Sequence, residues 1–60
     1  MKVADYIFKT PTVTICYDRD LETLYDGSIE NIPELLLKYS VIRVYINKVK
    51  NFTLFRVLER

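Results

Sequence analysis

The sequence contains no histidine and no tryptophan, and it has one cysteine (Cys16), one glycine (Gly27) and two prolines (Pro11 and Pro33). Without histidine, neither a Ser-His-Asp nor a Cys-His catalytic arrangement can form. A single cysteine excludes an internal disulfide and, among scattered carboxylates, makes no zinc or iron site. One glycine cannot build a phosphate-cradling loop. We therefore expect no catalytic residues, no metal and no cofactor, and a protein that is not an enzyme.

Two weaker chemical patterns also favour ordinary structural roles. Asp18 and Asp20 lie in an expected turn, where acidic side chains are usually solvated, and the stretch lacks the glycine and distal glutamate of a calcium loop. Cys16 falls within an expected strand, where we predict a half-buried residue instead of a reactive thiol.

Long hydrophobic runs are missing as well. The longest uncharged apolar run is Leu35-Leu36-Leu37, far shorter than a membrane span, and Asp5 interrupts any signal-peptide core. We therefore expect a cytoplasmic protein with no membrane partner.

Sixty residues form a single domain, residues 1–60. A chain of this size buries only about 60% of its extended surface, so its stability is marginal. Half of the residues are apolar, and neither a disulfide nor a metal is available to stabilise the fold. Association with another chain is the remaining way to do so.

The charges are divided unevenly along the chain. Residues 1–34 carry three basic and seven acidic groups, whereas residues 35–60 carry six basic groups and one acidic group, which together give the net charge of +1. Either the two halves of the domain attract each other or both sets of charges face water.

The pattern predicts an α+β fold. Alternating β-branched residues favour a strand over 12–17, followed by a polar turn and a returning strand over 22–26 that ends at Gly27. A short helix is expected at about 32–39, capped by Asn31, with an apolar stripe. Residues 2–9 fit either a short N-terminal helix, which we favour slightly, or a strand. The expected stripe consists of Ile32, Leu35, Leu36 and Tyr39.

A second hairpin is predicted over 41–47 and 52–58, so that two hairpins form an antiparallel four-stranded sheet with the helices packed on one face. Its expected inner face consists of Ile42, Val44, Ile46, Phe55 and Val57. Its expected outer face is also largely apolar, although a sheet with one solvated face should alternate apolar and polar residues. This predicted interaction face comprises Val41, Arg43, Tyr45, Phe52, Leu54, Arg56 and Leu58.

The apolar outer face predicts a non-catalytic protein–protein interaction protein, either a homodimer or an accessory subunit of a larger protein. The alternative is a small nucleic-acid-binding module that uses the basic second hairpin. A sequence pI near 7.8 argues against that alternative. Its expected contacts are Arg43, Tyr45, Lys48, Lys50 and Arg56.

Short motifs along nearly the whole chain resemble a loose group of small proteins encoded by phages and mobile elements of Gram-positive bacteria. The motifs are Met1-Lys2-Val3 with Asp5 and Ile7, then Val13-Thr14-Ile15, Tyr25-Asp26-Gly27, Ile32-Pro33, Leu36-Leu37, and Val41 with the closing hairpin. The resemblance implies a helix–hairpin–helix–hairpin protein without assigned catalytic residues. The sequence departs from the group in its aromatic residues Phe52 and Phe55.

Overall fold

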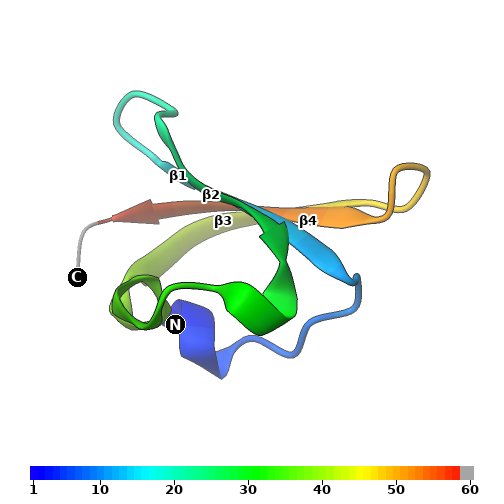
Figure 1. Cartoon of the computed structure of the whole chain (residues 1–60). Coiled ribbons are helices and arrows are strands. Elements are labelled where there is room, and N and C mark those ends of the chain that lie inside the picture. The colour runs from blue at the N-terminus through cyan, green and yellow to red at the C-terminus, as the bar shows by residue number, and fades with distance from the viewer. Residues whose placement is uncertain (59–60) are drawn as a thin grey trace.

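Two β-hairpins form the frame of the molecule. A computed structural model describes residues 1–58. The strands are β1 (Thr12–Tyr17), β2 (Thr23–Ser28), β3 (Ser40–Asn47) and β4 (Phe52–Leu58). They form one sheet in the order β2-β1-β4-β3 (Figure 1). The prediction of two hairpins in one four-stranded sheet is confirmed.

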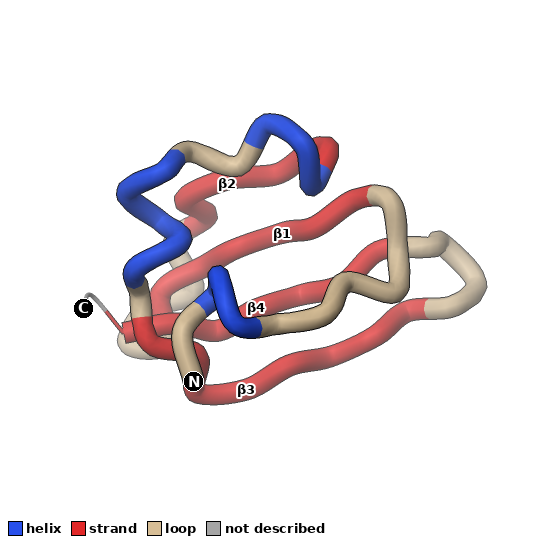
Figure 2. Tube along the Cα trace, turned by 90° about the horizontal axis from the view of Figure 1, so that it is seen from below, coloured by secondary structure: helices blue, strands red, loops and turns tan. Residues whose placement is uncertain are grey.

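The sheet is mixed, so the prediction of a wholly antiparallel sheet is wrong. Each hairpin is antiparallel, but the central strands β1 and β4 pair in parallel. Residues 29–39 carry the chain from the end of β2 to the opposite edge and opposite end of the sheet (Figure 2). Strand β4 therefore returns in the direction of β1, and the buried side chains of Ile15 and Phe55 become neighbours in the middle of the sheet.

The predicted α-helix at about 32–39 does not form; the structure has 3₁₀ turns there instead. The segment forms two short 3₁₀ turns, η2 (Ile29–Asn31) and η3 (Glu34–Lys38). Ile32 and Pro33 between them have ψ of 126° and 134°, outside the helical region. For Ile32 the cause is the following proline, which disfavours a helical conformation in the residue before it. Asn31 caps nothing and lies inside η2, whereas Ser28 accepts a hydrogen bond from the backbone of Glu30.

The 3₁₀ geometry also changes which residues of the predicted stripe face the sheet. With three residues per turn, Leu36 and Tyr39 lie on one side and both are buried. Leu35, expected in the same stripe, is 64% exposed. The α+β description therefore reduces to a small β-sheet with 3₁₀ turns.

The N-terminal segment combines the two alternatives for residues 2–9. Val3–Asp5 forms a single 3₁₀ turn, η1, while Lys2 makes an isolated antiparallel bridge with Ser40 at the edge of β3. Hydrogen bonds from the Val3 amide to the Tyr39 carbonyl (3.1 Å) and from the Val41 amide to the Met1 carbonyl (2.7 Å) hold the segment there.

The turns and the N-terminal segment cover only one side of the sheet, and the core lies between them and the sheet (Figures 1 and 2). At its centre the Phe55 ring is fully buried and meets the Tyr6 and Phe8 rings edge-on, with centroids 5.0 and 5.7 Å away. Such edge-to-face contacts are a favourable aromatic geometry. The inner-face positions predicted for Phe55 and Val57 are confirmed, and the buried core consists of Val3, Val13, Ile15, Leu36, Tyr39, Phe55 and Val57.

Candidate interaction face

The side of the sheet away from the turns faces outward along β3 and β4, while the loop of the first hairpin bends toward it beyond the end of β1 (Figure 1). We call this side the open face. Directly paired residues on neighbouring strands point to the same side, so the strand registers identify its members. Strand β4 shows the alternation clearly, because Thr53, Phe55 and Val57 are buried and the residues between them are not. The open face consists of Thr12, Thr14, Cys16, Thr23, Asp26, Ser28, Ser40, Arg43, Tyr45, Asn47, Phe52, Leu54, Arg56 and Leu58.

An apolar strip runs along β4 and onto β3. Phe52 and Leu54 are half-buried, whereas Leu58 and Tyr45 are 46% and 45% exposed. None of the four lies beneath the 3₁₀ turns. Six of the seven residues predicted for the interaction face therefore share one uncovered surface.

Val41 is the exception, and its predicted position is wrong. A bulge between Val41 and Arg43 inserts Ile42 as an extra residue in β3. The bulge shifts the alternation by one, so Val41 pairs with Val57 and packs against the core. Ile42, expected on the inner face, is 43% exposed instead. Single-residue alternation could not reveal a bulge in a strand that is apolar on both sides.

Two arginines lie directly opposite each other on the open face. Arg43 pairs with Arg56 across β3 and β4, an unfavourable arrangement for like charges. Asp18 compensates, because its carboxylate Oδ1 lies 3.1 Å from Arg56 Nε and its carbonyl accepts a 3.4 Å hydrogen bond from the Arg56 guanidinium. The Nε contact is an ion pair without an aligned hydrogen bond. Arg43 has no ion pair among residues 1–58 and stays exposed.

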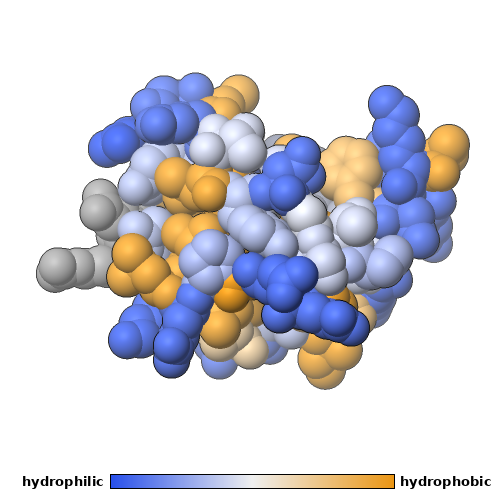
Figure 3. Space-filling view, viewed as in Figure 1, coloured by the Kyte–Doolittle hydropathy of each residue, from blue (hydrophilic) through white to orange (hydrophobic). Residues whose placement is uncertain are grey.

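The opposite edge of the open face is acidic. Asp26 on β2 is exposed and accepts a 3.1 Å hydrogen bond from the Thr14 hydroxyl. Asp18 and Asp20 follow β1 in the loop of the first hairpin, and Figure 3 shows hydrophilic residues gathered at both hairpin loops. The charge asymmetry of the sequence thus becomes an asymmetry across one surface, acidic at β2 and basic at β3.

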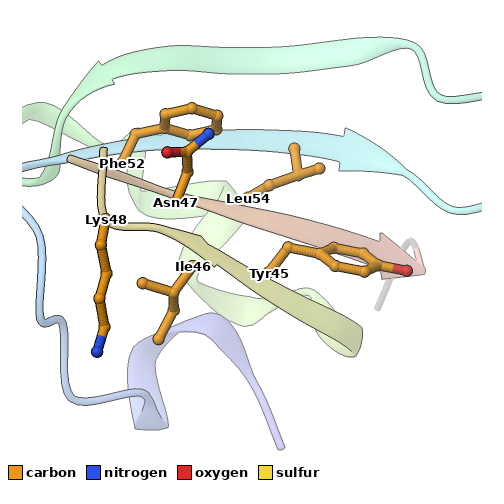
Figure 4. Close-up of a pocket in the computed structure, with 6 residues that line it drawn as sticks. All are labelled: Tyr45, Ile46, Asn47, Lys48, Phe52 and Leu54. Carbon is orange, nitrogen blue, oxygen red and sulfur yellow. The ribbon is translucent and has the colours of Figure 1, made fainter. Parts of the chain in front are cut away.

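A hollow of about 360 Å³ lies at the loop end of the second hairpin. In Figure 4 the Phe52, Asn47 and Leu54 side chains project from one side of the hairpin, whereas Ile46 and Lys48 project from the other. The hollow is shallow and open. Its lining residues are Tyr45, Ile46, Asn47, Lys48, Phe52 and Leu54.

The contacts expected for nucleic acid are only partly brought together. Arg43, Tyr45 and Arg56 share the open face, but Asp18 neutralises Arg56. The Lys48 side chain extends to the other side of the hairpin (Figure 4), and Lys50 lies in the loop.

The remaining candidate groups make no reactive site in the described part of the chain. Cys16 is more deeply buried than expected, at 4% exposure, and its thiol donates to the Phe55 carbonyl at 3.5 Å. Burial raises the pKa of this thiol, and nearby Arg56 opposes the shift. Within residues 1–58, no three acidic or cysteine side chains converge to hold a metal ion, and no helix has the length and apolar character to cross a bilayer.

Comparison with known proteins adds no relative: no family model, curated protein or solved structure matches the chain. The resemblance to short phage and mobile-element proteins therefore stays a prediction.

Proposed function

We propose that this chain is a non-catalytic protein–protein interaction protein that binds its partner through the open face. The single observation that carries the proposal is the apolar strip of Phe52, Leu54, Leu58 and Tyr45, which no described segment of the chain covers. A sheet with one solvated face normally presents polar residues there.

The proposal agrees with the small size of the fold. A chain of 60 residues buries too little surface for ample stability, and covering the strip with another chain removes further apolar area from water. The tyrosine and the arginines beside the strip are residue types enriched in protein interfaces.

The test compares surface variants by capture of tagged protein from cells that also express an untagged copy. Tyr45→Glu and Leu54→Glu place a carboxylate within the strip, and we expect each to lower partner recovery at least tenfold, because a buried unpaired charge is costly. Leu35→Glu, at a 64% exposed position on η3, is the matched control and should retain the partner.

Circular dichroism of each variant separates lost binding from lost folding. Recovery of the same partners at the same yield by folded Tyr45→Glu, Leu54→Glu and Leu35→Glu would refute the proposal.

The nucleic-acid alternative stays a prediction with a clear test. Binding through Arg43, Lys48 and Lys50 should weaken steeply as salt rises, because phosphate contacts release counterions. Absence of any mobility shift with single-stranded DNA or RNA at low salt would exclude it.

A further inference from the structure

The strand registers arrange the open face in three rows that run across the sheet. Each row contains one residue from each strand, in the order β2, β1, β4, β3. The middle row is Asp26, Thr14, Leu54 and Tyr45; the row toward the C-terminal end of β4 is Thr23, Cys16, Arg56 and Arg43; and the third row is Ser28, Thr12, Phe52 and Asn47.

If two copies of this face stack as aligned sheets, two symmetric arrangements are available. In the first, the two-fold axis is perpendicular to the strands and runs along the middle row, so each strand lies opposite the same strand of the second copy. Asp26 then faces Asp26, and the apolar strips face each other. An axis parallel to the strands sets β3 over β2 and β4 over β1, so each basic edge faces an acidic edge.

The charges favour the second arrangement. With the axis parallel to the strands, the Tyr45 hydroxyl of one copy faces the Asp26 carboxylate of the other and can donate to it. Arg43 faces Thr23, next to Glu22, in a loop where Asp20 already lies 3.5 Å from Arg19. Like charges are then kept apart, and Arg43, which has no ion pair within residues 1–58, gains acidic neighbours.

We propose that the partner is a second copy of this chain, stacked on the open face about a two-fold axis parallel to the strands. This inference rests on the proposed function and names the partner. Aligned sheets pack about 10 Å apart, with the strands of one sheet at roughly 30° to those of the other.

The size of the face fits a weak dimer. The two longer extents of the molecule, 28 and 21 Å, limit the footprint of its broad side to roughly 590 Å², so two copies bury at most about twice that, near the lower end of stable interfaces. Each copy covers the apolar strip of the other with the threonine side chains of β1, whereas Cys16 is only 4% exposed.

The experiment measures the dimer dissociation constant by sedimentation equilibrium for single-charge variants at Thr23, an exposed residue. Thr23→Asp places a carboxylate opposite Arg43 of the second copy, and we expect the dissociation constant to fall roughly two- to fivefold. Thr23→Lys should raise it by a similar factor. In an Arg43→Ala background both effects should disappear.

The direction of each change in the dissociation constant distinguishes contacts between copies from effects within one copy. Within one copy, Thr23→Asp adds a like charge to the acidic loop and Thr23→Lys adds an opposite one, so intramolecular effects run against the predicted changes in dimer affinity. High salt should reduce the difference between the two variants.

Two results would overturn the inference. A chain that stays monomeric at millimolar concentration excludes the second copy, and the proposed function survives if Leu54→Glu still loses a different captured protein. A dimer whose dissociation constant changes with neither Thr23 variant excludes the axis parallel to the strands. With the axis perpendicular to the strands, Thr23 faces the neutral Ser28, so a charge at position 23 has no opposing charge.

Discussion

A buried pair of hydroxyls, Thr10 and Thr53, provides a direct test of how the N-terminal segment is fixed to the sheet. Their Oγ1 atoms lie 2.7 Å apart, and the side chains are 6% and 0% exposed. Thr10 Oγ1 also donates to the Thr12 carbonyl at 2.9 Å. Because a threonine hydroxyl has only one hydrogen, Thr53 must be the donor within the pair.

This assignment makes the two valine substitutions unequal. Thr10→Val removes the acceptor of the Thr53 hydroxyl and leaves a fully buried donor unsatisfied, so we expect a loss of about 2–3 kcal/mol in the free energy of unfolding. Thr53→Val removes one hydrogen bond and orphans no donor, which should cost about 1 kcal/mol. The loss in free energy of unfolding for the double variant should be about 1–2 kcal/mol smaller than the sum of the two single losses, because the double variant contains no unpaired Thr53 hydroxyl.

The assay is urea unfolding followed by circular dichroism at one fixed protein concentration, since a dimer makes apparent stability depend on concentration. In thermal unfolding, each 1 kcal/mol corresponds to a shift of about 4–8 °C for a domain of this size. If Thr53→Val costs as much as Thr10→Val, or if the two losses simply add, then Thr53 does not donate to Thr10 and the reasoning fails.

Two further predictions concern the first hairpin. Leu21 is 57% exposed and has a φ of 62°, a left-handed conformation that glycine adopts freely. Leu21→Gly should therefore raise the free energy of unfolding by about 0.5–1 kcal/mol. An unchanged or lower urea midpoint would contradict this prediction. Burial raises the pKa of the Cys16 thiol above its ordinary value of 9.0, so the thiol ionises at a lower pH in the unfolded chain than in the folded one. The difference in free energy of unfolding between the natural sequence and Cys16→Ala should therefore be constant below pH 9.0, and the natural sequence should lose stability as the pH rises toward the folded-state pKa. A difference that does not depend on pH would contradict this prediction.

The second hairpin shows how far strand alternation can predict this fold. Its bounds, its turn and the burial of Phe55 and Val57 follow from alternating β-branched and aromatic residues, which form half-buried strands wherever the sheet is assembled. The position of Val41 does not follow, because the bulge at Ile42 is invisible where both strand faces are apolar.

The apolar stripe at 32–39 was a weaker predictor. Eight residues at helical spacing are too few to form a helix without tertiary support. Pro33 holds the chain extended at the entry to η3, and the sheet below needs only Leu36 and Tyr39 from this segment. The 3₁₀ turn supplies both residues and leaves Leu35 in solvent.

The two hairpins, and the apolar character of the second hairpin on both of its sides, can be predicted from side-chain alternation and from turn residues that are close together in the chain. The parallel pairing of β1 with β4, and the positions of Asp26 and Arg43 at opposite edges of the open face, become visible once the strands are assembled. Those relations depend on the path of residues 29–39 across the sheet, and local patterns of hydrophobicity carry no information about that path.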